Sequence, residues 1–170
     1  MIEIAFLADH PEAIPTLAQW FQAQWPAYYA GRAPADIAQD FRAEANRNGL
    51  PVRLVAFAAG ALAGTITLRA QALHALPEYR PGLGGLFVLE RHRGQGVGTE
   101  LVKAGMSVAA EQGYEKVYAT TITARGILEC LGWKLIKTVA HNDEQLAIYG
   151  CELEDRRSAP PSAGFTLRGS

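Results

Sequence analysis

The sequence predicts a mixed α/β domain with one central β-sheet and helices on its faces. The chain has 170 residues, 49% of them hydrophobic and 19% charged, which is typical of one globular domain. Short apolar runs typical of buried strands alternate with segments in which apolar residues recur at helical spacing. Glycine and proline separate these segments, and the resulting order is β-α-α-β-β-β-α-β-α-β-β.

The first segments predict one strand and two helices. Residues 2–8, IEIAFLA, have the composition of a strand, and apolar residues at helical spacing predict a helix over 11–27. Proline suits the first turn of a helix, so we expect a second helix from Pro34 to Asn46, before the Asn48-Gly49 turn.

The next segment is apolar enough to raise the question of a membrane span. Between Arg53 and Arg69 lie fifteen residues without a charge. A helix needs about 20 such residues to cross a bilayer, and Ala59-Gly60 in the middle is typical of a turn. We therefore predict two adjacent strands, 52–58 and 61–69.

A loop over 71–83 leads to the central strand of the predicted sheet. Residues 83–89 form a short apolar run, which predicts a buried strand. Gly84-Gly85 predict a local distortion in this strand, either as the hinge of a bulge or as the place where a bulky neighbour packs.

The second half predicts two helices and three strands. Apolar or small residues recur at helical spacing over 97–112, and residues 116–121 alternate like a strand. Thr123 is expected to cap a short helix over 124–131. Two further strands are expected at 133–139 and 145–153.

The end of the chain has a different composition. Residues 154–170 are rich in proline, serine and glycine and show no periodicity, which predicts a flexible tail after a single domain of residues 1–153. Edge strands in such a domain often pair across a dimer, so homodimer formation is one expectation.

Composition argues against several classes of function. The formal net charge of -1 gives no general electrostatic reason to bind nucleic acid or an anionic membrane. Cys130 and Cys151 form no C-x-x-C pair, the histidines lack metal-site spacing, and the N-terminus lacks the pattern of a secretory signal. We therefore expect a cytoplasmic protein without a metal. Any anion that it binds must be held by a local group of residues, because the overall charge is close to zero.

One glycine-rich segment predicts a local anion-binding site. It is Arg93-Gly94-Gln95-Gly96-Val97-Gly98-Thr99, between the central strand and the helix over 97–112. Alternate glycines remove Cβ atoms from the loop, so successive N–H groups can turn toward an anion. The amides and the positive dipole end of the following helix point to the same place. The Arg93 side chain and the Thr99 hydroxyl are further donors.

Spacing decides against two nucleotide motifs. A dinucleotide fingerprint is G-x-G-x-x-G, whereas this loop is G-x-G-x-G. A P-loop requires G-x-x-x-x-G-K-[ST], and no Gly-Lys-Ser or Gly-Lys-Thr occurs in the chain.

The segment instead resembles the signature of the GNAT superfamily of acyl-CoA-dependent N-acyltransferases. That signature, R/Q-x-x-G-x-G/A, is matched fully by Arg93-x-x-Gly96-x-Gly98, and a second landmark is similar to Ala124 to Leu131-Gly132-Trp133. The resemblance implies a mixed sheet with a splayed central strand pair and helices on both faces. It also implies acetyl-CoA as co-substrate, with the pyrophosphate on the amides of the glycine-rich segment and the pantetheine arm beside Phe87 and Val88.

The implied reaction is direct attack of a primary amine on the acyl thioester. Family members often place a tyrosine, able to protonate the leaving thiolate, four residues before the landmark glycine; here that position is Leu128. Tyr118, Glu78 and Tyr79 are the candidates for acid and base roles, although the more common explanation is a packed aromatic for Tyr118 and a solvated loop residue for Glu78 and Tyr79.

The acceptor is expected near the first helix. Core packing at helical spacing explains Phe21 and Trp25, whereas Tyr28-Tyr29 follow the end of that helix and are candidates for the wall of an acceptor pocket.

These observations predict an N-acetyltransferase that transfers an acetyl group from acetyl-CoA to a primary amine of a small molecule or protein in a ternary complex. Leu128 and the lack of a clear base keep open a second hypothesis, a catalytically silent acyl-CoA-binding or regulatory module. A third, a dinucleotide-binding oxidoreductase, is disfavoured by the loop spacing.

Overall fold

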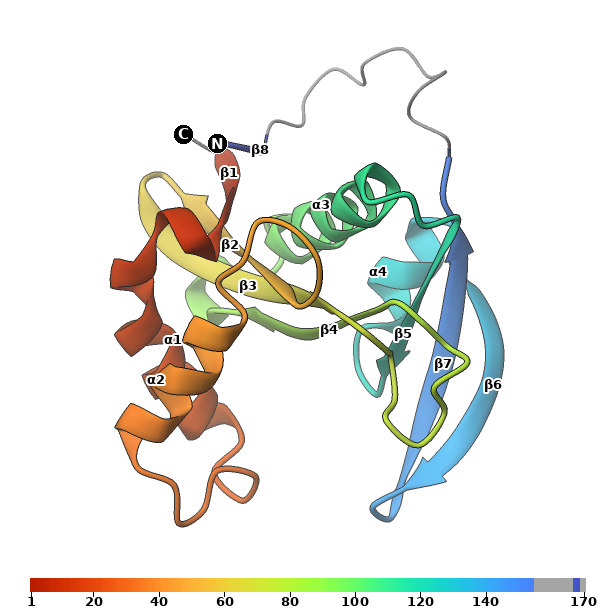
Figure 1. Ribbon diagram of the computed structural model, residues 1–170, viewed down its shortest axis with the longest axis horizontal. Coiled ribbons are helices and arrows are strands. Elements are labelled where there is room, and N and C mark those ends of the chain that lie inside the picture. Colours follow the sequence, from red (N-terminus) through yellow and green to blue (C-terminus); the bar gives the residue numbers. More distant parts are fainter. Residues whose placement is uncertain (155–166, 169–170) are drawn as a thin grey trace.

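A single sheet with helices on both faces organises the chain (Figure 1). The computed structural model describes residues 1–154 and 167–168, and its strand order is β6-β7-β5-β4-β3-β2-β1-β8. Side chains of β2 (Val52–Ala58) alternate between the faces: Leu54 packs in the core with α3 (Val97–Glu111), and Val55 packs in the core with α1 (Ile14–Gln24) and α2 (Pro34–Ala43). The predicted fold class is therefore confirmed.

The N-terminal elements are shorter than predicted. β1 is Ile2–Phe6, and Leu7–Asp9 and Pro11–Ala13 form 3-10 turns before α1 begins. α1 ends at Gln24, and α2 ends three residues before Asn46. The Asn46 side chain donates to the carbonyls of Ala43 and Pro51, both at 2.9 Å, and so satisfies one of the carbonyls that a helix end leaves free.

The apolar run forms the hairpin that the sequence predicts. β2 pairs antiparallel with β3 (Ala61–Arg69), and the turn between them places Ala59 and Gly60 at φ +50° and +82°. These positive values are those of a tight turn whose twist matches the strands. Among the helices of residues 1–154, none is long and apolar enough to cross a membrane.

β4 (Gly82–Val88) is distorted on one side and separated from its neighbour on the other. In its register with β3, Thr65 faces Phe87 and Thr67 faces Gly84, so Ile66 opposes both Gly85 and Leu86. This is a β-bulge, and Gly85 has φ +57°. On the other side, β4 pairs in parallel with β5 (Lys116–Thr121) at Gly82 and Leu83, and the strands then separate. The splayed central pair is present.

The remaining elements follow the predicted order with small shifts. α4 is Arg125–Cys130; its N-cap is Ala124 and it has no side-chain cap, so the predicted cap at Thr123 is wrong. The N–H of Ala124 donates to Thr121 Oγ1 at 2.7 Å, which fixes the turn before the helix. β6 (Lys134–His141) and β7 (Glu144–Glu152) form a hairpin at the end of the sheet.

The predicted tail is described in part. Leu167–Arg168 form β8, which pairs in parallel with β1, a pairing that the prediction of a flexible tail did not include. The rest of that prediction falls on 155–166 and 169–170, which lie outside the described residues.

Candidate active site

The separation of β4 from β5 opens a cavity of about 580 Å³ beside the glycine-rich loop; we call it the donor cavity. Leu86–Val88 of β4 form one wall. Thr123, Ala124 and Ile127, at the start of α4, form another wall, and the loop before α3 closes one end.

The loop is shaped to hold an anion with backbone groups. Gly94 and Gly96 have φ +75° and +88°, and Gly96 is the N-cap of α3. The amides of Val97, Gly98 and Thr99 open the helix and therefore lack an intrahelical acceptor. A Cβ added at Gly94 or Gly96 would meet nothing within 4 Å, so the space in front of the loop is open. Together these groups form an anion cradle at the positive end of the helix dipole.

The predicted cofactor-binding residues gather around this cavity. Phe87, Val88, Arg93, Gly94, Gly96, Val97, Gly98 and Thr99 all line it. Gln95 does not, because its side chain turns back and donates to the carbonyl of Arg91 at 3.4 Å. Arg93 also folds back, with Nε donating to the carbonyl of Val88 at 2.9 Å.

The backbone of β4 turns the N–H and carbonyl of Val88 toward the gap. The N–H of Leu89 donates to the carbonyl of Ala63 at 2.8 Å, so it points toward β3. Because backbone groups alternate along a strand, the N–H and carbonyl of Val88 point the other way, toward the gap. The bond from Arg93 to the Val88 carbonyl agrees with this direction. An extended ligand in the gap could therefore pair with Val88 as an added strand does.

A second cavity, of about 560 Å³, lies between the first helices and the bulge; we call it the acceptor cavity. Tyr28 and Tyr29 line it, with their rings 4.8 Å apart; that this cavity takes the acceptor stays a prediction. Trp25 lines both cavities and is 38% exposed, so its assignment to the core was wrong. The helix ends at Gln24, which takes Trp25 off its buried face.

A buried arginine that the sequence analysis did not single out lies at the base of the acceptor cavity. Arg53 is 3% exposed, and its guanidinium contacts Glu44 at 3.1 Å and Thr65 Oγ1 at 3.1 Å. It also lies 4.9 Å from the centre of the Phe41 ring. Burial lowers the pKa of Arg53, and the charge of Glu44 opposes that change. The ion pair is therefore what keeps this charge in the protein interior.

Two guanidinium groups explain the glycines of the bulge. A Cβ added to Gly84 would lie 2.5 Å from Arg69 Nη2, and one added to Gly85 would lie 2.9 Å from Arg53 Nη2. Gly84-Gly85 therefore serve both of the purposes that the sequence left open: they form the bulge, and they make room for bulky neighbours.

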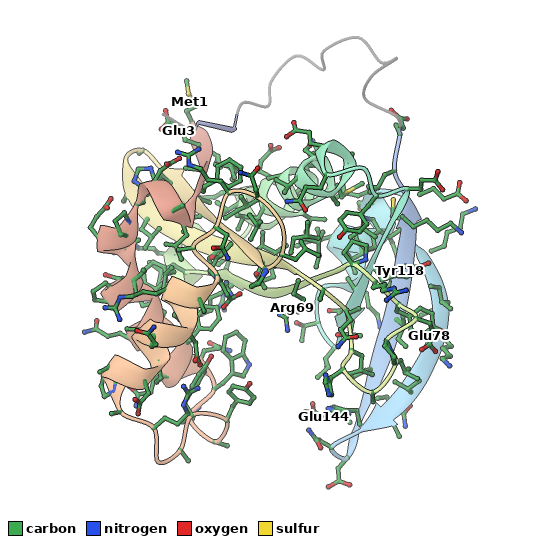
Figure 2. All side chains as sticks on the ribbon, in the orientation of Figure 1. Met1, Glu3, Arg69, Glu78, Tyr118 and Glu144 are labelled. Carbon is green, nitrogen blue, oxygen red and sulfur yellow. The ribbon has the colours of Figure 1, made fainter. Side chains whose placement is uncertain are left out.

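The candidate acid and base residues lie away from both cavities. The rings of Tyr79 and Tyr118 are 5.4 Å apart, Lys137 Nζ is 5.7 Å from the Tyr79 ring, and Glu78 is exposed. Figure 2 shows Tyr118 and Glu78 beside the β5–β7 half of the sheet and Arg69 apart from them. None of the three candidates lines either cavity, so their catalytic roles stay predictions. Leu128 is 3% exposed and belongs to the core.

A mixed sheet splayed between two parallel strands, with an anion cradle at one end of the gap, is the arrangement that the resemblance to acyl-CoA-dependent transferases implies. A family model described as the acetyltransferase (GNAT) family matches residues 14–127. The chain belongs to the GNAT family of acetyltransferases. A comparison of the sequence with curated proteins found no match.

Solved structures agree with this assignment. An aminoglycoside 6'-N-acetyltransferase complexed with coenzyme A is 17% identical, with a TM-score of 0.70 over 92% of this chain and 98% of that chain. A GNAT acetyltransferase from Streptococcus pneumoniae is 14% identical, with a TM-score of 0.68 over 91% of this chain and 100% of that chain. The structure of yncA from Salmonella typhimurium with its cofactor acetyl-CoA is 14% identical, with a TM-score of 0.66 over 96% and 99%.

At these identities the structural likeness shows the fold, and the family model shows the general activity, which is acyl-CoA-dependent acetyl transfer. Within residues 1–154 and 167–168, no three histidine, cysteine, aspartate or glutamate side chains gather as they would around a metal ion.

Proposed function

We propose that this protein is an N-acetyltransferase, which transfers the acetyl group of acetyl-CoA to a primary amine by direct attack in a ternary complex. One observation carries the proposal: the two cavities meet at the β4 bulge. Leu86 lines the donor cavity, the adjacent Gly85 lines the acceptor cavity, and Trp25 lines both. A thioester in the first cavity and an amine in the second would come within reach of each other at this point.

The residues of the donor cavity fit coenzyme A. The amides at the start of α3 would hold the pyrophosphate, and Arg93 would add a positive charge beside it. The backbone groups of Val88 would pair with the amides of the pantetheine arm. Coenzyme A supplies the activated acetyl group, and this chain supplies its position.

The reaction balances without a covalent enzyme intermediate. The amine nitrogen forms a bond to the carbonyl carbon and the carbon–sulfur bond breaks. The nitrogen loses one proton to water, and the thiolate that leaves takes one up from water, so the products are the amide and the thiol of coenzyme A. Backbone N–H groups of β4 in the gap would stabilise the oxyanion. An amine of pKa near 10.4 costs about 4–5 kcal/mol to neutralise at pH 7, whereas protonating a thiolate of pKa near 8.5 contributes only about 2 kcal/mol. An apolar residue at Leu128 is therefore compatible with turnover.

Both carboxylates that line the acceptor cavity are already paired, and its half-buried tyrosine stays protonated. Asp40 pairs with Arg32 at 2.6 Å, and Glu44 pairs with Arg53 at 3.1 Å. Burial raises the pKa of Tyr29, which keeps its hydroxyl protonated at neutral pH. We therefore assign none of these three groups as the base.

A pair of matched glycine variants tests the proposal. Gly96 and Gly113 have φ +88° and +92°, and a Cβ at either would meet nothing within 4 Å, so alanine strains both backbones alike. Only Gly96 lines the donor cavity. The two glycines lie at opposite ends of α3, whose 15 residues separate them by about 20 Å. Calorimetry with coenzyme A should show affinity about tenfold weaker in Gly96→Ala and unchanged in Gly113→Ala.

Turnover is measured in parallel with acetyl-CoA and a panel of primary amines, by thiol release and by the mass of the acetylated product. The expected result is acetylation of at least one amine by the wild-type protein. The proposal would be overturned if the protein did not bind coenzyme A and released no thiol with any amine. Tight coenzyme A binding without turnover on any amine would favour the silent acyl-CoA-binding module instead.

A further inference from the structure

We infer that the acceptor is an amine that also carries a carboxylate, and that Arg69 binds this carboxylate in the acceptor cavity. The inference rests on the proposed function, because it names the class of amine that this cavity takes.

Arg69 is placed where the two cavities meet. It is the last residue of β3, it is exposed, and it lines the acceptor cavity. Its Nη2 lies 2.5 Å from the position of a Cβ on Gly84 and 3.3 Å from that of a Cβ on Gly85, so its guanidinium covers the bulge. A carboxylate held here would lie close to an amine that attacks at the bulge. This arrangement fits an amine with an adjacent carboxylate, as in an α-amino acid.

The charges of the cavity leave Arg69 without a counterion. Each of the two carboxylates that line it has its own arginine, since Asp40 pairs with Arg32 and Glu44 pairs with Arg53. In the part of the chain that the structure describes, no carboxylate forms an ion pair with Arg69. A guanidinium in this state offers the planar donor fork that recognises carboxylates.

Arg53 strengthens the case for an anion at this position. Both guanidinium groups lie within 3.5 Å of the position of a Cβ on Gly85, so two positive charges are neighbours at the bulge. Burial lowers the pKa of Arg53, and the charge of Arg69 adds to that lowering. Because Glu44 already pairs with Arg53, a carboxylate from the acceptor would balance the second charge. A polycationic amine would be repelled from the same place.

The aromatic walls of the acceptor cavity suggest which side chain a test ligand should carry. Tyr28 and Tyr29 line the cavity with Phe21 and Phe41, which favours an apolar side chain on the acceptor. Suitable probes are therefore phenylalanine, leucine and methionine, each compared with its carboxamide and with its decarboxylated amine. The carboxamide keeps the shape and removes only the negative charge.

The experiment measures binding and turnover on the full chain. Calorimetry with the coenzyme A-loaded protein should show at least one acid binding about tenfold more tightly than its carboxamide and its decarboxylated amine. Arg69→Gln should weaken binding of the acid about tenfold and leave binding of the carboxamide unchanged, and Arg69→Lys should restore part of the loss. Arg42→Gln is the matched control, because Arg42 is an exposed arginine of α2 that does not line the cavity.

The outcomes separate this inference from the proposed function. Acids that bind in an Arg69-dependent way without thiol release would support the carboxylate site and overturn the transferase proposal. Turnover of phenethylamine or spermidine in preference to the acids would leave the transferase standing and overturn the carboxylate site. Equal binding of acids and carboxamides, no binding of any acid, or an Arg69→Gln protein that keeps the preference would also overturn it.

Discussion

The two cavities that meet at the β4 bulge are built in different ways. The donor cavity draws its hydrogen-bonding groups from backbone, at the start of α3 and along β4. The acceptor cavity draws its groups from side chains that α2, β2 and β3 bring together, among them Glu44, Arg53 and Arg69. A backbone-built site depends on one contiguous segment and its glycines. A side-chain-built site depends on long-range packing and on charges that must be neutralised inside the protein.

The largest effect is therefore expected when a charge of the acceptor cavity loses its partner. Glu44→Gln would leave the Arg53 guanidinium, whose side chain is 4% exposed, without its carboxylate. Removing one partner of a buried ion pair costs about 3–5 kcal/mol. Because Glu44 is partly exposed, we expect a loss at the lower end of this range, about 3 kcal/mol of unfolding free energy. Urea unfolding measures this change, and calorimetry should show unchanged coenzyme A affinity in the folded variant.

The matched control is Asp40→Asn, which removes a carboxylate from the same cavity. Its partner Arg32 is 35% exposed and Asp40 is 54% exposed, so the loss should stay below about 1 kcal/mol. Adding Arg53→Met to Glu44→Gln should recover stability, since no buried charge then remains. Equal losses for Glu44→Gln and Asp40→Asn would show that burial of Arg53 does not distinguish the two pairs.

Trp25 belongs to both cavities, so its removal tests whether they work as one site. Its ring contacts Phe21 and Phe87, with centroid distances of 5.0 and 6.2 Å, and it lines each cavity. Trp25→Ala removes apolar surface from both ligand positions, so the KM for acetyl-CoA and the KM for the acceptor should each rise about tenfold. Steady-state kinetics with each substrate varied in turn measures both values.

Trp20→Ala is the control for this comparison. The Trp20 ring also packs on Phe87, at 5.5 Å, but it lines neither cavity. Its two KM values should stay near those of the wild-type protein. A rise in only one KM for Trp25→Ala would mean that the cavities do not share this wall in the working enzyme.

The same difference decides what could be predicted from the sequence. The donor cavity depends on a contiguous glycine pattern, and the predicted residues other than Gln95 line it. The strands 52–58 and 61–69 were also predicted to the residue, because Ala59-Gly60 is a local turn signal.

The acceptor cavity could not be predicted in this way, because packing between distant segments brings its charged residues together. One signal was available: Arg53 falls inside a predicted buried strand, and a charge in that position requires a partner. Nothing local identifies Glu44 as that partner. Trp25 was misassigned because helical spacing continues in the sequence beyond Gln24, where the helix ends.

The smallest effect on stability and on coenzyme A affinity is expected at a hydrogen bond between α4 and the sheet. Neither of its two residues lines the donor cavity. Tyr149 of β7 donates its hydroxyl to Glu129 Oε1 of α4 at 2.6 Å, and α4 forms one wall of the donor cavity. This hydrogen bond to Glu129 raises the pKa of Tyr149 above its usual value near 10. The folded state therefore favours the protonated hydroxyl.

The sign of the pH dependence follows from linkage. Because the pKa is raised by folding, the contribution of Tyr149 is fully present below about pH 10 and is lost as the pH rises through the higher pKa of the folded state. Tyr149→Phe removes that contribution, and Glu129→Gln reduces it, because the glutamine keeps an acceptor oxygen and loses the negative charge. The difference in unfolding free energy between wild type and either variant should be constant near neutral pH and shrink in the alkaline range. Urea unfolding across this range measures it, and a difference that stays constant would show that the bond does not control the titration.

Coenzyme A affinity at neutral pH should change little in these variants. The bond lies outside the lining of the donor cavity, whereas the proposed phosphate and pantetheine contacts belong to the backbone of α3 and β4.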